Sequence, residues 1–139
     1  MDILVLIGRI LFSALFLGSA VGHLTQTKAM AGYASSKGVP QAFAATLVSG
    51  LVIAAGGLMV LLGIWADLGA LLLVIFLVPT ALLMHAFWKE SDAQARQGEM
   101  IQFQKDIALA GAALMLFALI SFAGDELGLT ITGPLFDIS

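Results

Sequence analysis

The sequence has no cysteine and few charged residues, and both shortages exclude classes of protein. Without a thiol, the chain carries no disulfide, no thiolate metal site and no dithiol redox chemistry of its own. Six Lys and Arg residues against nine Asp and Glu give a formal net charge of −3. This balance excludes a nucleic-acid-binding module, which would present a basic face. With only two histidines we also expect no metal site.

Hydrophobic residues take the place of the missing charges. They make up 60% of the 139 residues, against roughly 45–50% in soluble globular chains. Charged residues make up 11%, against about 25% in such chains. The mean hydropathy is +1.05. A soluble fold of this length would not hide so much apolar surface behind so few charges, so the composition predicts an integral membrane protein.

Four apolar stretches are long enough to cross a bilayer as helices, which takes about 20 mostly apolar residues each. They cover residues 3–22, 42–64, 68–88 and 107–123, and we expect a further short interfacial helix over residues 25–36. The second and third helices are joined by a tight turn around Trp65-Ala66-Asp67, so they are antiparallel neighbours. The sequence therefore predicts an all-α fold, an antiparallel up-and-down membrane four-helix bundle, with residues 1–139 as a single domain.

The distribution of basic residues predicts the orientation in the membrane. With four crossings, links 23–41 and 89–104 lie on one side and both termini on the other. Five of the six basic residues lie in or beside these links, namely Lys28, Lys37, Lys89, Arg96 and Lys105. By the positive-inside rule we expect both links in the cytoplasm and both termini outside, in a bacterial inner (plasma) membrane.

A few polar side chains inside the membrane or at the helix ends are candidate functional residues. Arg9 either snorkels to the outer interface or faces the bundle interior with Ser13 and Phe16, where it would pair with a carboxylate, a carbonyl or a bound ligand. The others gather at the opposite end of the bundle and are His23, His85, Trp88, Lys105 and Asp106. They are either interfacial anchors and helix-end partners or one polar cluster that relays protons or holds a ligand head group.

Small residues and one proline are expected to shape the packing of the helices. Gly18 and Gly22 in the first helix, and Gly56 and Gly57 in the second, permit the close approach that drives helix association in lipid. Pro79 is expected to kink the third helix, which either shapes the bundle or opens a ligand slot.

The succession of short motifs along nearly the whole chain resembles the DoxX family of small four-helix membrane proteins. The residues that carry the resemblance are Gly8-Arg9, Phe12, Phe16, Gly18, His23, Tyr33, Gly38-Val39-Pro40, Gly56-Gly57, Leu62-Gly63, His85-Ala86-Phe87-Trp88 and Lys105-Asp106-Ile107-Ala108-Leu109. The family often carries a glutamate shortly before the paired glycines, whereas residues 50–55 contain no acid here. If that glutamate partners the arginine of the first helix in other members, Arg9 must have another acceptor.

The resemblance implies a membrane subunit associated with an oxidoreductase, such as a thiosulfate–quinone or superoxide-detoxifying assembly. Three hypotheses follow. The first, which we favour from the sequence, is a subunit that docks on or stabilises a larger membrane complex and is not catalytic alone. The second is a quinone-dependent oxidoreductase subunit, in which Arg9, His23 and His85 place the head group of a quinone, the one cofactor that we consider. The third is a lipid or small-molecule carrier that uses a slot near Pro79. A homo-oligomer is equally compatible with the glycine-rich faces.

Overall fold

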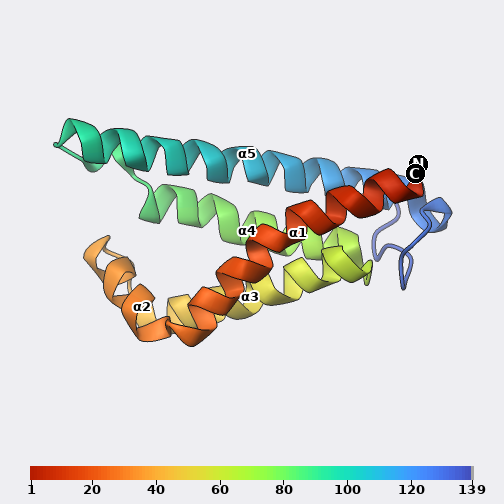
Figure 1. Ribbon diagram of the computed structural model, residues 1–139, viewed down its shortest axis with the longest axis horizontal. Helices are drawn as coiled ribbons and strands as arrows, with labels where there is room; N and C mark the ends of the chain where they lie inside the picture. Colours follow the sequence, from red (N-terminus) through yellow and green to blue (C-terminus); the bar gives the residue numbers. More distant parts are fainter. Residues whose placement is uncertain (139) are drawn as a thin grey trace.

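The computed structural model describes residues 1–138, which are folded into helices without any strand (Figure 1). The elements are α1 (Asp2–Thr25), α2 (Thr27–Ser36), α3 (Ala42–Leu62), α4 (Ala66–Met84), the short 3₁₀ helix η1 (Phe87–Lys89), α5 (Ala93–Ala123) and the 3₁₀ turn η2 (Gly124–Glu126). Four of them, α1, α3, α4 and α5, are long and apolar enough to cross a membrane. The predicted all-α fold is confirmed, and the protein is an integral membrane protein.

The long helices run up and down between two ends of the molecule (Figure 1). α1 packs on α3, α3 on α4, and α4 on α5, while the short α2 packs on α3. Both chain termini lie at one end, together with the turn between α3 and α4; we call this the terminal end. The opposite end holds α2, η1 and the beginning of α5, and we call it the link end.

The last long helix begins much earlier in the chain than the apolar run predicts. We expected a helix over 107–123 after a link of residues 89–104, whereas α5 begins at Ala93. Asp92 is its N-cap, because its side chain accepts a hydrogen bond from the amide of Ala95 at 2.8 Å. Residues 93–104 are polar but rich in Ala, Gln and other good helix formers. The 31-residue helix is about 46 Å long at 1.5 Å per residue, so it exceeds a hydrocarbon core of about 30 Å.

Several other helix boundaries differ by a few residues from the expected ones, among them the end of α1 at Thr25 instead of residue 22, the beginning of α2 at Thr27 instead of 25 and the beginning of α4 at Ala66 instead of 68. α4 ends at Met84 instead of residue 88, so His85 is its C-cap and Trp88 lies in η1. α3 ends at Leu62, where Gly63 takes the left-handed conformation at φ 69°. This glycine ends the helix at no steric cost from a Cβ, and the chain turns into α4 within three residues.

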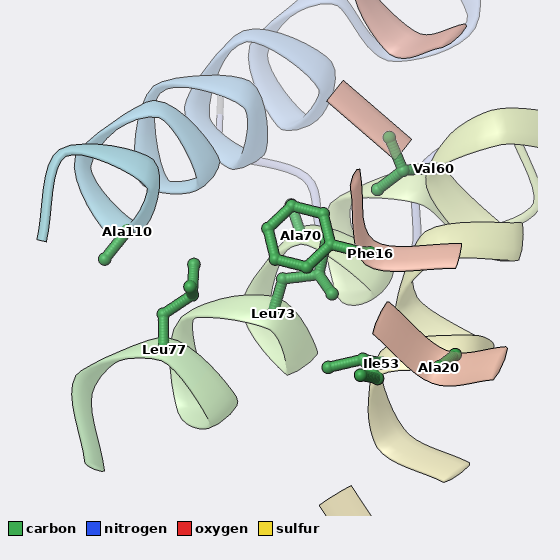
Figure 2. Packing of buried hydrophobic residues seen from close by; sticks show 8 residues of the cluster. All are labelled: Phe16, Ala20, Ile53, Val60, Ala70, Leu73, Leu77 and Ala110. Atoms are coloured by element: carbon green, nitrogen blue, oxygen red, sulfur yellow. The ribbon is translucent and has the colours of Figure 1, made fainter. Parts of the chain in front are cut away.

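The core contains small, branched and aromatic side chains from all four long helices (Figure 2). Its buried members are Phe16 and Ala20 of α1, Ile53 and Val60 of α3, Ala70, Leu73 and Leu77 of α4, and Ala110 of α5. The alanines allow the helix backbones to approach closely, which is how helices associate in lipid.

The four glycines predicted to pack helices have different surroundings. A Cβ on Gly56 would lie 2.9 Å from the carbonyl oxygen of Gly69 in α4, and one on Gly57 would lie 3.1 Å from Leu17 in α1. Those two glycines therefore lie at close helix contacts. By contrast, a Cβ on Gly18 would meet no atom within 4 Å, and one on Gly22 would meet only Met30 of α2, at 3.7 Å.

Candidate functional site

A cavity with a volume of about 740 Å³ is lined by residues of all five α helices. Its wall is mainly apolar and includes Leu15, Ile75 and Leu83. Pro79 and the residue four positions before it, Ile75, both line it. Because proline has no amide hydrogen, the carbonyl of Ile75 loses its usual helix partner at this point. Pro79 therefore lies beside the cavity, and a ligand slot at this proline stays a prediction.

Four of the six predicted site residues line this cavity, namely His23, His85, Lys105 and Asp106. They come from the end of α1, the C-cap of α4 and the middle of α5, so they are brought together only by the folding of the bundle. The cavity therefore has apolar walls and a set of ionisable groups among its lining residues. A volume of this size is typical of small-molecule sites.

Glu99 is the centre of a polar network at the link end. One carboxylate oxygen lies 2.7 Å from Nδ1 of His85, and the other accepts from Nζ of Lys37 at 2.8 Å and from the hydroxyl of Tyr33 at 3.2 Å. Lys37 also donates to Glu90, at 3.1 Å. These contacts connect α2 and the residues after it to η1 and α5 beside the cavity.

The network shifts the pKa values of Lys37 and Tyr33, which lie outside the membrane helices. The hydrogen bond from Lys37 to Glu99 raises the pKa of the lysine above its ordinary value, despite the opposing effect of burial. Burial, together with the negative charge of Glu99, raises the pKa of Tyr33. At neutral pH the lysine is therefore charged and the tyrosine keeps its hydroxyl hydrogen, as the observed bonds require.

Two polar residues of the lining, the partly buried His23 and the buried Asp106, have atoms without a hydrogen-bond partner in the described residues. Nδ1 of His23 lies 2.8 Å from the carbonyl oxygen of Ser19, which can only accept, so this nitrogen carries the hydrogen. Asp106 is 5% exposed and receives no hydrogen bond from any residue in 1–138. Its nearest cationic nitrogens are Nζ of Lys105 at 3.5 Å and Nε2 of His85 at 3.7 Å.

Trp88 lies outside the cavity, in an aromatic cluster with Phe87 and Phe103. The ring centroids of Trp88 and Phe103 are 5.7 Å apart and nearly perpendicular, and those of Phe87 and Phe103 are 5.4 Å apart. Half of the Trp88 side chain is exposed. Trp88 therefore contacts aromatic rings and does not line the cavity, and its role as an interfacial anchor stays a prediction.

Arg9 lies far from the other candidates, at the terminal end, and faces the bundle interior. It is 1% exposed, and its guanidinium donates to three carbonyl oxygens, each at 2.8 Å: those of Val60, Leu61 and Leu129. Two of these acceptors belong to the last turn of α3, whose carbonyls have no partner within the helix. Arg9 therefore caps the carboxyl end of α3 and places a positive charge at its negative dipole end. This geometry excludes snorkelling. Of the partners considered for Arg9, a carboxylate, a carbonyl or a bound ligand, the structure shows carbonyls.

The segment after α5 closes the terminal end. The amides of Ile131 and Thr132 donate to the carbonyl of Gly63, at 3.0 and 2.9 Å. Asp67, which is fully buried, accepts from the amides of residues 135 and 136, at 3.0 and 2.7 Å. Together with Arg9, these contacts fix the segment across the turn between α3 and α4.

Comparison with known protein families identifies the family of this chain. The DoxX family model matches residues 4–86, which is more than half of the chain. The protein is a member of the DoxX family. It has no match among the curated proteins or the solved structures.

The DoxX match covers only part of the candidate site. Arg9, His23 and His85 lie within the matched residues, whereas Glu99 and Asp106 lie on α5, beyond them. The acceptors of Arg9 in α3 also answer the question raised by the missing acid in this DoxX protein. Since Val60 and Leu61 supply carbonyl oxygens, the arginine needs no carboxylate.

Sequence reasoning missed Glu99, Lys37 and Tyr33 as site residues. A signal for Glu99 was available, because Glu99 and Asp106 are seven residues apart and share a helix face once the helix includes residue 99. The contacts of Lys37 and Tyr33 join residues 62 and 66 positions apart, so no local pattern could indicate them. The same applies to Asp67 and its partners near the end of the chain.

Proposed function

We propose that this DoxX protein binds an amphipathic small molecule inside the bundle, and that a membrane quinone is the first ligand to test. The observation that carries the proposal is the cavity of about 740 Å³ with apolar walls and with His23, His85 and Asp106 in its lining. The apolar walls suit an isoprenoid or acyl tail, and the ionisable side chains suit a polar head group. This is the second of our three hypotheses, with one change: Arg9 is not a contact of the ligand.

A variant that fills the cavity tests this proposal. Ala45 lines the cavity on α3, whereas its neighbour Ala44 is exposed and does not. We expect Ala45→Phe to weaken the binding of a short-tailed quinone at least about tenfold, because the added ring occupies space that the ligand needs. Ala44→Phe adds the same ring to the outside of the helix and should leave binding unchanged. Equal binding by both variants, measured by calorimetry in detergent, would contradict the proposal.

A lipid carrier would use the same cavity, and the content of the purified protein distinguishes the two hypotheses. A quinone extracted with the protein in stoichiometric amount supports the quinone hypothesis. A phospholipid in its place supports the carrier, which then uses the slot beside Pro79 that lines the cavity.

The accessory-subunit hypothesis has an observation of its own. Gly8 and Gly18 on α1 and Gly111 on α5 are exposed, and a Cβ on any of them would meet no atom of the chain within 4 Å. Lipid-facing glycines allow another membrane helix to approach closely. A stable larger complex in mild detergent, which an exposed glycine changed to Leu disrupts, would support docking on a larger, redox-associated complex. A uniform homo-oligomer would instead show that the docking partner is a second copy of this chain.

We further propose that the link end faces the cytoplasm and the terminal end faces outward, in a bacterial plasma membrane. The support is the concentration of basic residues at the link end. Because the chain has no cysteine, single introduced cysteines report orientation cleanly. In intact cells an impermeant maleimide should label Asp125→Cys and leave Ser91→Cys unlabelled. The reverse labelling would overturn this orientation.

A further inference from the structure

We infer that the cavity selects ligands whose head group donates hydrogen bonds, so that it holds a quinol in preference to the corresponding quinone. The inference deepens the proposed function, since it states which chemistry the head group must present. It rests on two side chains that line the cavity with acceptor atoms left open, Asp106 and His23.

Asp106 is the main acceptor. Its side chain is 7% exposed, and the two cationic nitrogens nearest to it lie 3.5 and 3.7 Å from its oxygens. The carboxylate thus has charge partners but no hydrogen-bond donor within residues 1–138. A carboxylate that is mostly removed from water and has no hydrogen-bond donor is poorly stabilised. A ligand hydroxyl in the cavity would supply the missing donor.

His23 presents a second acceptor. Because its Nδ1 donates to the carbonyl of Ser19, the neutral ring has its lone pair on Nε2. No residue of the described chain bonds to Nε2. The ring is held by its edge contact with Phe76, at 5.9 Å between centroids, and by the close approach of Gly50, where a Cβ would lie 2.8 Å from that of His23.

Several hydroxyl groups of the lining already donate their hydrogen to an acceptor of the protein. The hydroxyl groups of Thr46 and Thr80 donate to carbonyls of their own helices, at 2.7 Å each. The hydroxyl of Tyr33 donates to Glu99. One of the three N–H groups of Lys105 donates to Gln102 at 2.6 Å, and nearly half of the lysine side chain is exposed. Thr46, Thr80 and Tyr33 therefore offer no free donor to a bound molecule, while Asp106 and His23 offer acceptors.

A quinol, its quinone and its dimethyl ether separate this inference from simple tail binding. All three carry the same ring and tail, but only the quinol has O–H donors. We expect the decyl quinol to bind at least about tenfold more tightly than either the quinone or the dimethyl ether, since hydrogen bonds to a charged acceptor are the strong ones. The measurement is calorimetric titration of the intact protein in detergent under anaerobic conditions.

Variants then assign the preference to a residue. Asp106→Asn replaces one acceptor oxygen with a donor, so the ratio of quinol to ether affinity should fall severalfold. Asp125→Asn makes the same chemical change at an exposed position at the terminal end and should leave the ratio unchanged. Equal affinity for all three ligands in the unmodified protein would overturn the inference and leave the proposed function intact. Binding of none of them would overturn both, and a ratio that persists in Asp106→Asn would overturn the role of Asp106.

Discussion

At the scale of single residues, Arg9 has the clearest physical role. A buried arginine inside a membrane helix is expensive unless its donors are satisfied, and here three backbone carbonyls at 2.8 Å satisfy them. The same bonds give partners to the last turn of α3 and fix the segment that contains Leu129. A residue that resembles a ligand contact in the sequence is thus a structural cap in the fold.

Replacing Arg9 tests this role. We expect Arg9→Met to lower the free energy of unfolding by roughly 3 kcal/mol or more, because three buried acceptors lose their donor. The stability of Arg9→Lys should lie between that of the unmodified protein and that of Arg9→Met. An ammonium keeps the charge but lacks the planar fork that reaches three acceptors. Denaturant unfolding in detergent measures both. A stable Arg9→Met protein that has lost its bound ligand would instead place Arg9 in the binding site.

Gly63 makes a second prediction at the residue scale. Its φ of 69° is unfavourable for a residue with a Cβ, and a Cβ here would also lie 2.7 Å from Nη2 of Arg9 and from Cα of Thr130. Gly63→Ala should therefore lower the free energy of unfolding by at least about 1 kcal/mol, and the melting temperature should fall with it. Gly98→Ala is the control, because Gly98 lies within α5 with nothing near its Cβ and should be neutral or stabilising. Equal melting of the two variants would contradict the close packing at Gly63.

At the scale of elements, α2 is held to the beginning of α5 mainly by charged contacts. Lys37, directly after α2, bridges Glu90 and Glu99, and Tyr33 of α2 reaches Glu99. α2 otherwise packs on α3 and, to a smaller extent, on α1. The connection between α2 and α5 therefore depends on a small number of polar bonds.

Loss of the Lys37 contacts should loosen α2 selectively. We expect Lys37→Gln to speed amide hydrogen exchange in residues 27–36 about fivefold, equivalent to about 1 kcal/mol for a partly exposed ion pair. Lys28→Gln removes an exposed lysine of α2 that has no ion pair within the described residues, and it should leave exchange unchanged. Amide hydrogen exchange mapped by mass spectrometry compares the two variants with the unmodified protein. Equal rates in the two variants would mean that packing on α3 alone holds α2.

At the scale of the whole molecule, the sequence predicts the features that depend on residues close together in the chain. The four membrane helices follow from apolar runs of sufficient length, and the inward face of Arg9, Ser13 and Phe16 follows from helical spacing. The extension of α5 to Ala93 escaped prediction because a search for apolar runs passes over a polar helix. The acceptors of Arg9 and the partners of Asp67 escaped it because backbone groups and contacts across 50 or more positions leave no pattern in the sequence.

The candidate site was predictable in part for the same reason. Convergence of His23, His85, Lys105 and Asp106 follows from the up-and-down topology, and the structure gives these four residues a common cavity. Glu99 lay in a segment expected to be a link, so its role as the centre of the polar network depended on a helix that the apolar pattern did not include.

The measurement that tests the central claim most directly is native mass spectrometry of the protein released from its membrane in mild detergent, before and after incubation with decyl quinol. We predict a mass above that of the 14.5 kDa chain by one small amphipathic molecule, retained in Ala44→Phe and lost in Ala45→Phe. A bare chain in both samples, or a bound mass that Ala45→Phe does not remove, would contradict the assignment of the cavity as a ligand site.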